Sequence, residues 1–421
     1  MMPTNTPSPA RDATILLATR VVRLFVSGAV SIVLVLFLAA VGVEPSGIGL
    51  LLTLALAGDA AVSLFLSTRA DRFGRRRTLA AGAVLLAATG FVFATSDRFL
   101  WLAIAATGGV LSPTGKESGP FLAIEQAALA ECRPRRRRTH TFAWYQFAAS
   151  LAAAVGALAG GLAGSALQAM GWSAPAAYRA VFALYAAGGL AIVALVRQLS
   201  PAVEPSTKAV RGPARSLGLH RSRRTVLTLG SLFAVDAFAG GLIVQSLVAY
   251  WLARRFGVSE GAIGTLVFGM GVLSACSAPA SAWVAARLGL VRTMVFTHAP
   301  SNVLLGLLPF STTFAWASVV LLLRASVSQM DVPTRQSYVV AVVEPDERSA
   351  AAGLTGVART LGATGGPAIG GLLMAGWLGA PFVAAGLVKL TYDALLFLRF
   401  RHVRPPEEAV RTGCGAPATR T

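Results

Sequence analysis

The sequence predicts an all-α membrane protein, with twelve transmembrane helices in two six-helix bundles related by pseudo-twofold symmetry. Three observations support this: a very apolar composition, repeated runs of membrane-crossing length, and a similarity between the two halves of the chain. Of the 421 residues, 55% are hydrophobic and 13% are charged, whereas soluble domains are about 25% charged. Polar side chains are therefore too few to cover a soluble protein of this size.

Twelve stretches are long and apolar enough to cross a bilayer, which takes about 20 residues in a helix. The predicted spans are 14–40, 46–68, 78–95, 99–130, 140–168, 176–197, 226–251, 260–285, 293–311, 314–343, 349–375 and 379–400. A stretch rich in Pro, Ser and Arg separates the sixth span from the seventh and is typical of a linker. We therefore expect an N-terminal bundle at 1–197, a cytoplasmic linker at 198–225, a C-terminal bundle at 226–400 and a cytoplasmic tail at 401–421.

Basic residues gather on alternate connections between the predicted spans. The sequences TRADRFGRRR, RPRRRR and RLGLVR lie on even-numbered connections, whereas the odd-numbered connections carry few arginines. This asymmetry follows the positive-inside rule and predicts a multi-pass protein of the cell membrane with both termini in the cytoplasm. Contact with anionic lipid headgroups accounts for the net charge of +19. The lipid bilayer is therefore an expected partner, and nucleic acid is not.

The two halves of the chain resemble each other in order. A shift of 210 residues places Gly156 and Gly160 on Gly366 and Gly370, and a shift of 215 places ADRFGRRRTL on AARLGLVRTM. Parallel repeats of this kind occur in secondary transporters, where the substrate lies between the halves near the middle of the membrane. The repeat therefore predicts a transporter.

The basic stretch STRADRFGRRRTL at 67–79 lies between the second and third spans. It resembles motif A of the major facilitator superfamily, whose pattern is Gly, three residues, Asp, Arg or Lys, any residue, Gly, Arg, then Arg or Lys. Ser67 takes the place of the leading Gly. The matching residues are Asp71, Arg72, Gly74, Arg75 and Arg76. The resemblance implies the fold of that superfamily and transport by alternating access.

The residues of this motif suggest a cytoplasmic gate. Gly74 permits a tight turn, and Asp71 lies at a helix end, where a carboxylate meets helix N-termini and arginine forks. We expect Asp71 and Arg75 to hold the cytoplasmic side shut in one state of the cycle. The alternative is that the arginines only set topology, and this is our interpretation of Arg76 and Arg77.

Several polar residues lie inside the predicted spans, where an unpartnered charge is costly and usually faces a cavity or a partner. Those that we expect to line the cavity or to couple ions are Glu117, Glu125, Asp236, Asp331 and Arg335. A second group for the cavity comprises Asp59, Lys116, Gln245 and Arg324. For each residue the alternative is a buried ion pair that fixes packing. Arg20 and Arg23 are expected to snorkel towards the membrane surface.

Spacing predicts partners for some of these charges. Asp331 and Arg335 are four residues apart, on the helix face that also carries Arg324, and are expected to pair. The repeat register places Glu125 on Arg335, which suggests a salt bridge between the halves. Lys389 and Asp393, also four apart, suggest a local pair with no part in transport.

Glycines at four-residue spacing are expected to pack helices closely. They occur in the fifth and eleventh spans, and the residues concerned are Gly156, Gly160, Gly362, Gly366, Pro367 and Gly370. The sequence GATGGPAIGG resembles motif C of drug-exporting facilitators, which lies in the fifth span of those proteins. Here the fifth span has Ala157 in place of the proline. The resemblance therefore suggests export by proton exchange, while its position argues against it.

The sequence contains no phosphate-binding loop, metal-ligand spacing or nucleophile elbow, so we expect no enzyme, no cofactor and no metal. Transport must then be driven by an ion gradient or by the solute's own gradient, and embedded carboxylates favour protons. We expect a proton-coupled secondary transporter of a small organic solute, with an efflux antiporter as one form, acting as a monomer. The alternatives are a uniporter or symporter of an anionic metabolite, and a sensor or scaffold that has lost transport.

Overall fold

The structure is a computed structural model, and it describes residues 9–115, 121–132, 138–204, 221–344 and 347–403. These residues are almost entirely helical, and no strand occurs among them. The chain folds into two compact units, which we describe separately. Unit 1 comprises residues 1–212, 244–272 and 367–378, and unit 2 comprises residues 213–243, 273–366 and 379–421. The division at a linker stays a prediction, because residues 205–220 lie outside the described range.

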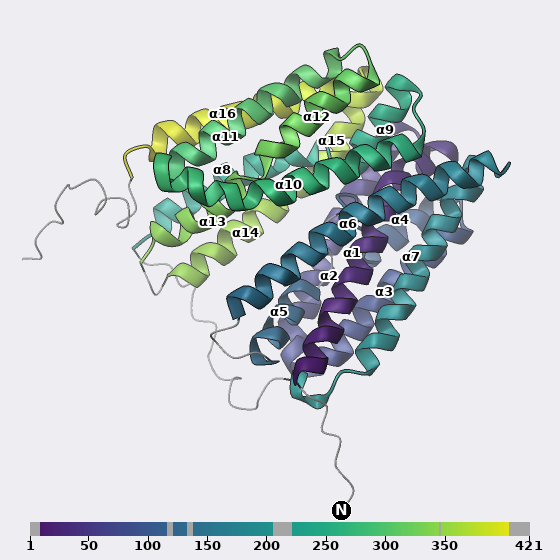
Figure 1. The fold of residues 1–421 in the computed structure, drawn as a ribbon, viewed down its shortest axis with the longest axis horizontal. Helices are drawn as coiled ribbons and strands as arrows, with labels where there is room; N and C mark the ends of the chain where they lie inside the picture. The colour runs from purple at the N-terminus through teal and green to yellow at the C-terminus, as the bar shows by residue number, and fades with distance from the viewer. Residues whose placement is uncertain (1–8, 116–120, 133–137, 205–220, 345–346, 404–421) are drawn as a thin grey trace, which may run out of the picture. The chain divides into compact units, whose positions relative to one another are not determined.

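Unit 1 contains most helices of the predicted N-terminal bundle. They are α1 (Pro9–Ala40), α2 (Pro45–Phe73), α3 (Arg75–Thr95), α4 (Phe99–Gly108), α5 (Phe121–Cys132), α6 (Arg138–Ala169), α7 (Ala174–Arg197) and the 3-10 helix η2 (Pro201–Val203). Unit 1 also includes α9 (Gln245–Phe256), the first part of α10 (Glu260–Leu288) and most of α15 (Gly366–Gly376). Helix α1 packs against α6 and α7, and α3 packs against α7 (Figure 1).

Unit 2 contains the remaining helices. They are α8 (Arg223–Gly241), the end of α10, α11 (Leu290–Leu307), the 3-10 helix η3 (Leu308–Phe310), α12 (Phe314–Ser328), α13 (Asp331–Ala341), α14 (Arg348–Thr364) and α16 (Ala380–Phe400). Helix α8 packs against α14 and α16, and α11 packs against α16 and α13. The core of this unit gathers around Phe233, Tyr338 and Tyr392, all of which are buried.

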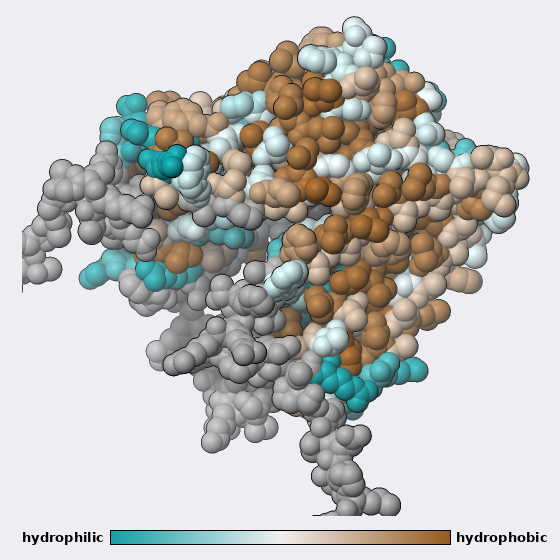
Figure 2. Space-filling model, viewed as in Figure 1, coloured by the Kyte–Doolittle hydropathy of each residue, from teal (hydrophilic) through white to brown (hydrophobic). Residues whose placement is uncertain are grey.

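The outer surfaces of the helices suit a lipid environment. Eight helical stretches within the described residues are long and apolar enough to cross a membrane. Large apolar side chains such as Phe91, Leu100 and Leu361 are more than 60% exposed, and Figure 2 shows hydrophobic side chains over much of one face. Such a surface is far more apolar than soluble monomers display. The prediction of an all-α membrane protein is confirmed.

Four spans that the sequence predicts as single helices are broken in the structure. They are the fourth (α4 and α5), the seventh (α8 and α9), the tenth (α12 and α13) and the eleventh (α14 and α15). Pro333 and Pro367 account for two of the breaks, because a proline ring clashes with the carbonyl four residues earlier and donates no hydrogen bond. Those carbonyls belong to Gln329 and Ala363, at or beside the ends of α12 and α14.

Glycines bring helix backbones into contact in both units. In unit 1, a methyl group added to Gly156 would lie 1.9 Å from the carbonyl oxygen of Phe25, and one added to Gly160 would lie 2.5 Å from that of Ala29. Helices α1 and α6 therefore approach at a distance that only glycine permits. Pro367 and Gly370 lie on α15, after the break that separates α14 from α15.

In unit 2, a methyl group on Gly362 would lie 2.2 Å from the carbonyl oxygen of Ala234, and one on Gly366 would lie 2.4 Å from backbone atoms of Gly241. These contacts hold the end of α14 and the start of α15 against α8. Close backbone contacts of this kind are a common way to associate helices in membranes.

Gly156→Ala should lower the melting temperature in detergent, because the new methyl group overlaps the backbone of α1. Overpacking of this kind typically costs about 1–3 kcal/mol. The control is Gly353→Ala in α14, where no atom lies within 4 Å of the added methyl group. If both variants melt at the wild-type temperature, the close approach of α1 and α6 is not what stabilises unit 1.

Candidate functional site

One buried carboxylate in unit 2 is shared by three permanent cations. Asp236 on α8 is 4% exposed. Its Oδ1 lies 2.5 Å from Nζ of Lys389 on α16, and its Oδ2 lies 3.2 Å from Nη1 of Arg359 on α14 and 3.4 Å from Nη1 of Arg335 on α13. Nε2 of His298 on α11 lies 3.7 Å from Oδ1. The carboxylate therefore links α8 to four other helices.

Arg335 also contacts the second predicted carboxylate of this region. Its Nη1 donates to Oδ2 of Asp331 at 2.9 Å, one turn earlier on α13. The two charges are therefore adjacent, as their spacing predicts. Arg324 lies before the break, on α12, and interacts electrostatically with Asp236 and Asp331. Its buried Nε has no hydrogen-bond partner among the described residues.

A second carboxylate on α16 faces α11 instead of its own helix. Oδ1 of Asp393 lies 2.8 Å from Nδ1 of His298, and its Oδ2 accepts from Nδ2 of Asn302 at 2.8 Å. The predicted local pair of Lys389 with Asp393 is therefore wrong. Lys389 instead reaches across to Asp236 on α8. Asp236 on α8 gives Lys389 a better partner, and His298 and Asn302 on α11 give Asp393 better ones.

Unit 1 contains a separate buried cluster around Glu125 on α5. Nη1 of Arg23 donates to Oε1 at 2.8 Å and Nη2 donates to Oε2 at 3.0 Å, which makes a bidentate pair. Thr19 donates to Oε1 at 3.0 Å, and the hydroxyl of Tyr145 donates to Oε2. Both Arg23 and Glu125 are at most 1% exposed.

This arrangement corrects two predictions. Arg335 was expected as the partner of Glu125, but Arg23 on the neighbouring α1 takes that position. The predicted salt bridge between the halves is wrong, since each partner pairs within its own half. Arg20 and Arg23 do not snorkel but are buried, and Arg20 donates to Gln146 at 2.9 Å. A carboxylate and an amide inside the bundle satisfy these arginines better than a distant surface.

The remaining predicted cavity residues occupy several places. Gln245 at the start of α9 donates to Oγ of Ser31 on α1 at 2.7 Å, within unit 1. Asp59 lies half-buried on α2 and interacts electrostatically with Tyr185. Lys116 and Glu117 lie outside the described residues.

The loop between α2 and α3 is held by a residue that sequence reasoning missed. Gly74 has a φ of +96°, which favours glycine. The carboxylate of Glu204 accepts from the backbone N–H of Arg75 at 2.6 Å and from that of Arg76 at 3.2 Å. It therefore caps the N-terminus of α3, where the helix dipole favours a negative charge. The side chains of Asp71 and Arg72 lie outside the described residues.

The arginines of this loop also bind backbone carbonyls after α7. Nη1 of Arg75 donates to the carbonyl oxygen of Val203 at 3.2 Å, and Nη2 of Arg76 donates to that of Arg197 at 3.3 Å. Arg75 is buried, so its guanidinium is a fixed part of the loop. Glu204 fell in the predicted linker, and no sequence pattern distinguished it.

A family comparison decides the identity of the fold. A model described as the Major Facilitator Superfamily matches residues 16–253 and 229–416. The chain belongs to the Major Facilitator Superfamily. The predictions of that fold and of a transporter in place of an enzyme are confirmed: this facilitator carries a solute across a membrane.

Relatives of this facilitator match it over more than nine-tenths of its length. It is 29% identical to the uncharacterized membrane protein YJR124C of Saccharomyces cerevisiae, over 93% of this chain and 94% of that one. It also resembles the inward-facing, occupied structure of a bacterial homolog to the human lysosomal transporter Spinster. The TM-score is 0.72 and the identity 16%, over 94% of this chain and 98% of that one. The structure of a D-xylose-proton symporter is similar with a TM-score of 0.68 and 15% identity, over 92% of this chain and 96% of that one. At these identities the structures show the fold alone.

Unit 1 of the facilitator joins segments from both predicted halves. The carboxylate of Glu260, at the start of α10, accepts from Oγ of Ser165 on α6 at 3.2 Å and from the hydroxyl of Tyr178 on α7. On α15, the backbone N–H of Ala368 donates to Oγ1 of Thr53 on α2 at 2.9 Å. Glu260 directly follows an outside connection in the predicted topology. These contacts join α10 and α15, which follow the predicted linker, to helices that precede it.

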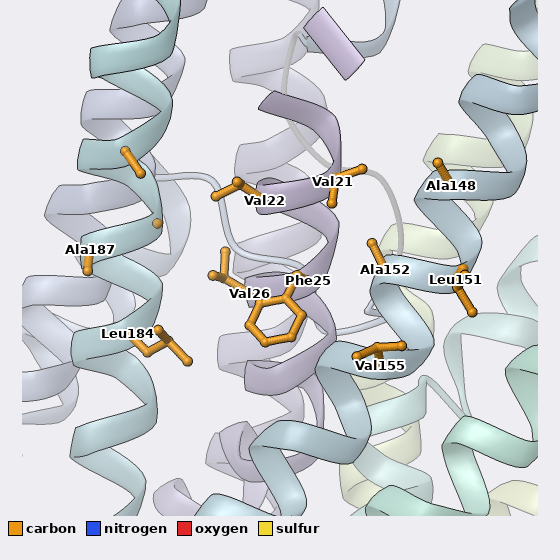
Figure 3. A pocket seen from close by; sticks show the side chains of 12 residues that line it. Val21, Val22, Phe25, Val26, Ala148, Leu151, Ala152, Val155, Leu184 and Ala187 are labelled. Atoms are coloured by element: carbon orange, nitrogen blue, oxygen red, sulfur yellow. The ribbon is translucent and has the colours of Figure 1, made fainter. Parts of the chain in front are cut away.

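Two cavities differ sharply in chemistry. One, of about 640 Å³ in unit 1, lies between α1, α6 and α7, and apolar side chains such as Val22, Phe25 and Leu184 line it (Figure 3). It offers no hydrogen-bonding side chain, so it suits an acyl chain better than a polar solute. The other, of about 420 Å³ in unit 2, is lined by both Arg335 and Arg359. Pockets of this size hold small organic molecules.

Glu204→Ala should lower the melting temperature of the facilitator, because two backbone N–H groups at the start of α3 lose their acceptor. Loss of a helix cap costs about 0.5–2 kcal/mol. Glu44→Ala is the control, since Glu44 is itself the N-cap residue of α2 but makes no side-chain cap hydrogen bond. Equal melting temperatures for the two variants would contradict the capping role.

Proposed function

We propose that this facilitator is a proton-coupled secondary transporter of a small organic solute, and that Asp236 is the carboxylate that binds the proton. The observation that supports this most strongly is the sharing of buried Asp236 by Lys389, Arg335 and Arg359. Asp236 and Lys389 lie on helical stretches apolar enough to span a membrane. A buried carboxylate is tolerated only when it is paired or protonated. We therefore assign Asp236 two states: charged while it is bound to the three cations, and neutral once the cations have left it.

The two states differ in how firmly the helices are joined. Charged Asp236 attracts three cations from α13, α14 and α16. When Asp236 is protonated, its charge is lost, and the cations are free to seek another anion or water. A proton thus changes the relative stability of two arrangements of unit 2, which is the requirement for coupling. The break between α12 and α13 and the break between α14 and α15 provide hinges about which these helices can move.

The cytoplasmic gate remains part of this proposal. Gly74 joins α2 to α3, Glu204 holds the first residues of α3, and Asp71 lies in the last turn of α2. Contacts between halves near Glu260 are consistent with a state that is closed on the outside, and the loop at 67–79 would close the opposite side in the other state. We place the facilitator in the cell membrane as a monomer, with both termini in the cytoplasm.

Efflux by exchange with protons is a second candidate. It rests on the stretch 362–371, which packs α14 and α15 closely against α8 and resembles the motif of drug exporters. A glycine-rich contact of this kind controls how far two helices separate, but it does not set direction.

The proposal is tested with purified protein in liposomes. The liposomes are incubated with a small-molecule extract of the cells that express the protein, with and without a pH gradient, and their contents are compared by mass spectrometry. We expect at least one solute to be accumulated or depleted only when the gradient is present. Protein-free liposomes and liposomes with Asp236→Asn serve as controls. A facilitator that moves no solute under either condition would be a sensor or scaffold instead.

A further inference from the structure

We propose that the cavity of about 420 Å³ in unit 2 binds the carboxylate of an organic anion, between the guanidinium groups of Arg335 and Arg359. This inference rests on the proposed function, and it names the chemical class of the solute. Both arginines line the cavity, together with Gln336 and Thr355. Arginine is the side chain best suited to bind a carboxylate through two parallel hydrogen bonds.

The two guanidinium groups keep donors available. Arg359 makes one ion pair among the described residues, from Nη1 to Asp236, and its side chain is 35% exposed. Arg335 uses the same atom, Nη1, for its pairs with Asp236 and Asp331, and its guanidinium also interacts with the Tyr392 side chain. A guanidinium carries five N–H donors. The outward-facing donors of Arg359 are therefore open to a ligand that enters the cavity.

The charges around the cavity also favour an anion. The permanent cations of this region outnumber its carboxylates, with Arg324, Arg335, Arg359 and Lys389 against Asp236, Asp331 and Asp393. An excess positive charge within a membrane-spanning unit is costly without a counter-ion. A carboxylate bound at Arg359 would supply the missing negative charge until Asp236 takes up a proton.

The remaining walls define the rest of the ligand. Phe233, Val339 and Val340 line the same cavity as the arginines, and the guanidinium carbon of Arg335 lies 5.5 Å from the ring centre of Phe233. An apolar body placed against these side chains would exclude water from the ion pair and so strengthen it. The cavity therefore suits a small amphipathic acid, with one carboxylate on an apolar or aromatic body.

Such a ligand competes with Asp236 for the same cations. When the ligand carboxylate takes hydrogen bonds from Arg359 and Arg335, Asp236 loses partners and accepts a proton from solution. One negative charge enters with the ligand and one positive charge enters with the proton, so the charge of the site is unchanged. The groups that face Asp236 from the surrounding helices are His298, Arg324, Asp331, Arg335, Arg359, Lys389, Tyr392 and Asp393.

The test measures ligand binding by the full-length protein in detergent. The probes are benzoate and 3-phenylpropanoate, with the neutral amides of both acids as matched controls, and the readout is the rise in melting temperature with concentration. We expect the acids to stabilise the protein and the amides to have no effect. Arg359→Gln should weaken binding of the acids about tenfold or more. Arg348→Gln, an exposed arginine on the same helix, should bind as the wild type does.

Asp236→Asn supplies a second, opposite expectation. Because the amide competes less well for the arginines, this variant should bind the acids more tightly than the wild type, and without dependence on pH. Equal stabilisation by acids and amides would overturn the proposal, as would unchanged binding by Arg359→Gln. Displacement of the acids by phosphatidylglycerol micelles, but not by phosphatidylcholine micelles, would reassign the site to a lipid headgroup.

The outcomes also separate this inference from the proposed function. A protein that binds the acids but moves no solute in liposomes keeps the anion site and loses the transport proposal. A protein that moves a neutral solute with protons, and binds neither acid, keeps the transport proposal and loses the anion site.

Discussion

Asp236→Ala should be among the most destabilising single substitutions in this facilitator. It removes the carboxylate that Lys389, Arg335 and Arg359 share and leaves three cations close together in a buried region. Breaking a buried ion pair by removing one partner typically costs about 3–5 kcal/mol, because the remaining charge is uncompensated. The effect is measured as a fall in melting temperature in detergent, followed by tryptophan fluorescence.

An exposed aspartate provides the control for this result. Asp97 pairs with Arg179, and their side chains are 56% and 33% exposed. Asp97→Ala should therefore change stability by about 0–1 kcal/mol, since water screens exposed pairs. In the double variant Asp236→Ala with Lys389→Met, one of the three cations is removed as well, and part of the lost stability should return. An Asp236→Ala protein that melts like Asp97→Ala would show that the cluster is not held by this carboxylate.

Glu125→Ala should have the largest effect in unit 1, for the same physical reason. Glu125 accepts both guanidinium hydrogen bonds of Arg23, at 2.8 and 3.0 Å, and both side chains are buried. Removing the carboxylate leaves Arg23 charged and without its main counter-ion, at a cost of about 3–5 kcal/mol. The same thermal measurement reports the loss.

A double-mutant cycle separates the pair from its surroundings. Arg23→Met with Glu125→Ala should be more stable than Glu125→Ala alone, because the stranded charge is gone. Thr19→Val removes a single donor to the carboxylate of Glu125 and should cost about 1.5–3 kcal/mol, less than Glu125→Ala. If the double variant is no more stable than Glu125→Ala, the destabilisation comes from lost packing and not from an unpaired arginine.

Much of the fold was predictable, because it follows from composition and from motifs that are local in sequence. Apolar runs locate the spans, and the residues around Gly74 identify the family before any contact is known. The pairing of Asp331 with Arg335 follows from helix geometry alone. Even the breaks beside Pro333 and Pro367 have a local cause, although the sequence does not say whether neighbouring helices would hold a proline within a continuous helix.

The buried networks were predictable only in part, because their partners lie far apart in sequence. Asp236 and Glu125 stand out as carboxylates in apolar runs, but nothing in the sequence chooses Lys389 for the first and Arg23 for the second. His298 and Asn302 are four residues apart in the ninth span, and that spacing was a signal that sequence reasoning passed over. Glu204 gave no such signal, since its role depends on the position of α3.

The most direct test of the central claim measures proton movement together with solute movement. Liposomes that contain the purified facilitator and a pH-sensitive dye are held at zero membrane potential with potassium and valinomycin. A solute identified by the extract experiment is then added. The account predicts that the internal pH changes as the solute crosses in the wild type. In Asp236→Asn, solute exchange should persist while the pH change is lost. A solute that crosses without a pH change in the wild type, or a pH change that survives in Asp236→Asn, would contradict the account.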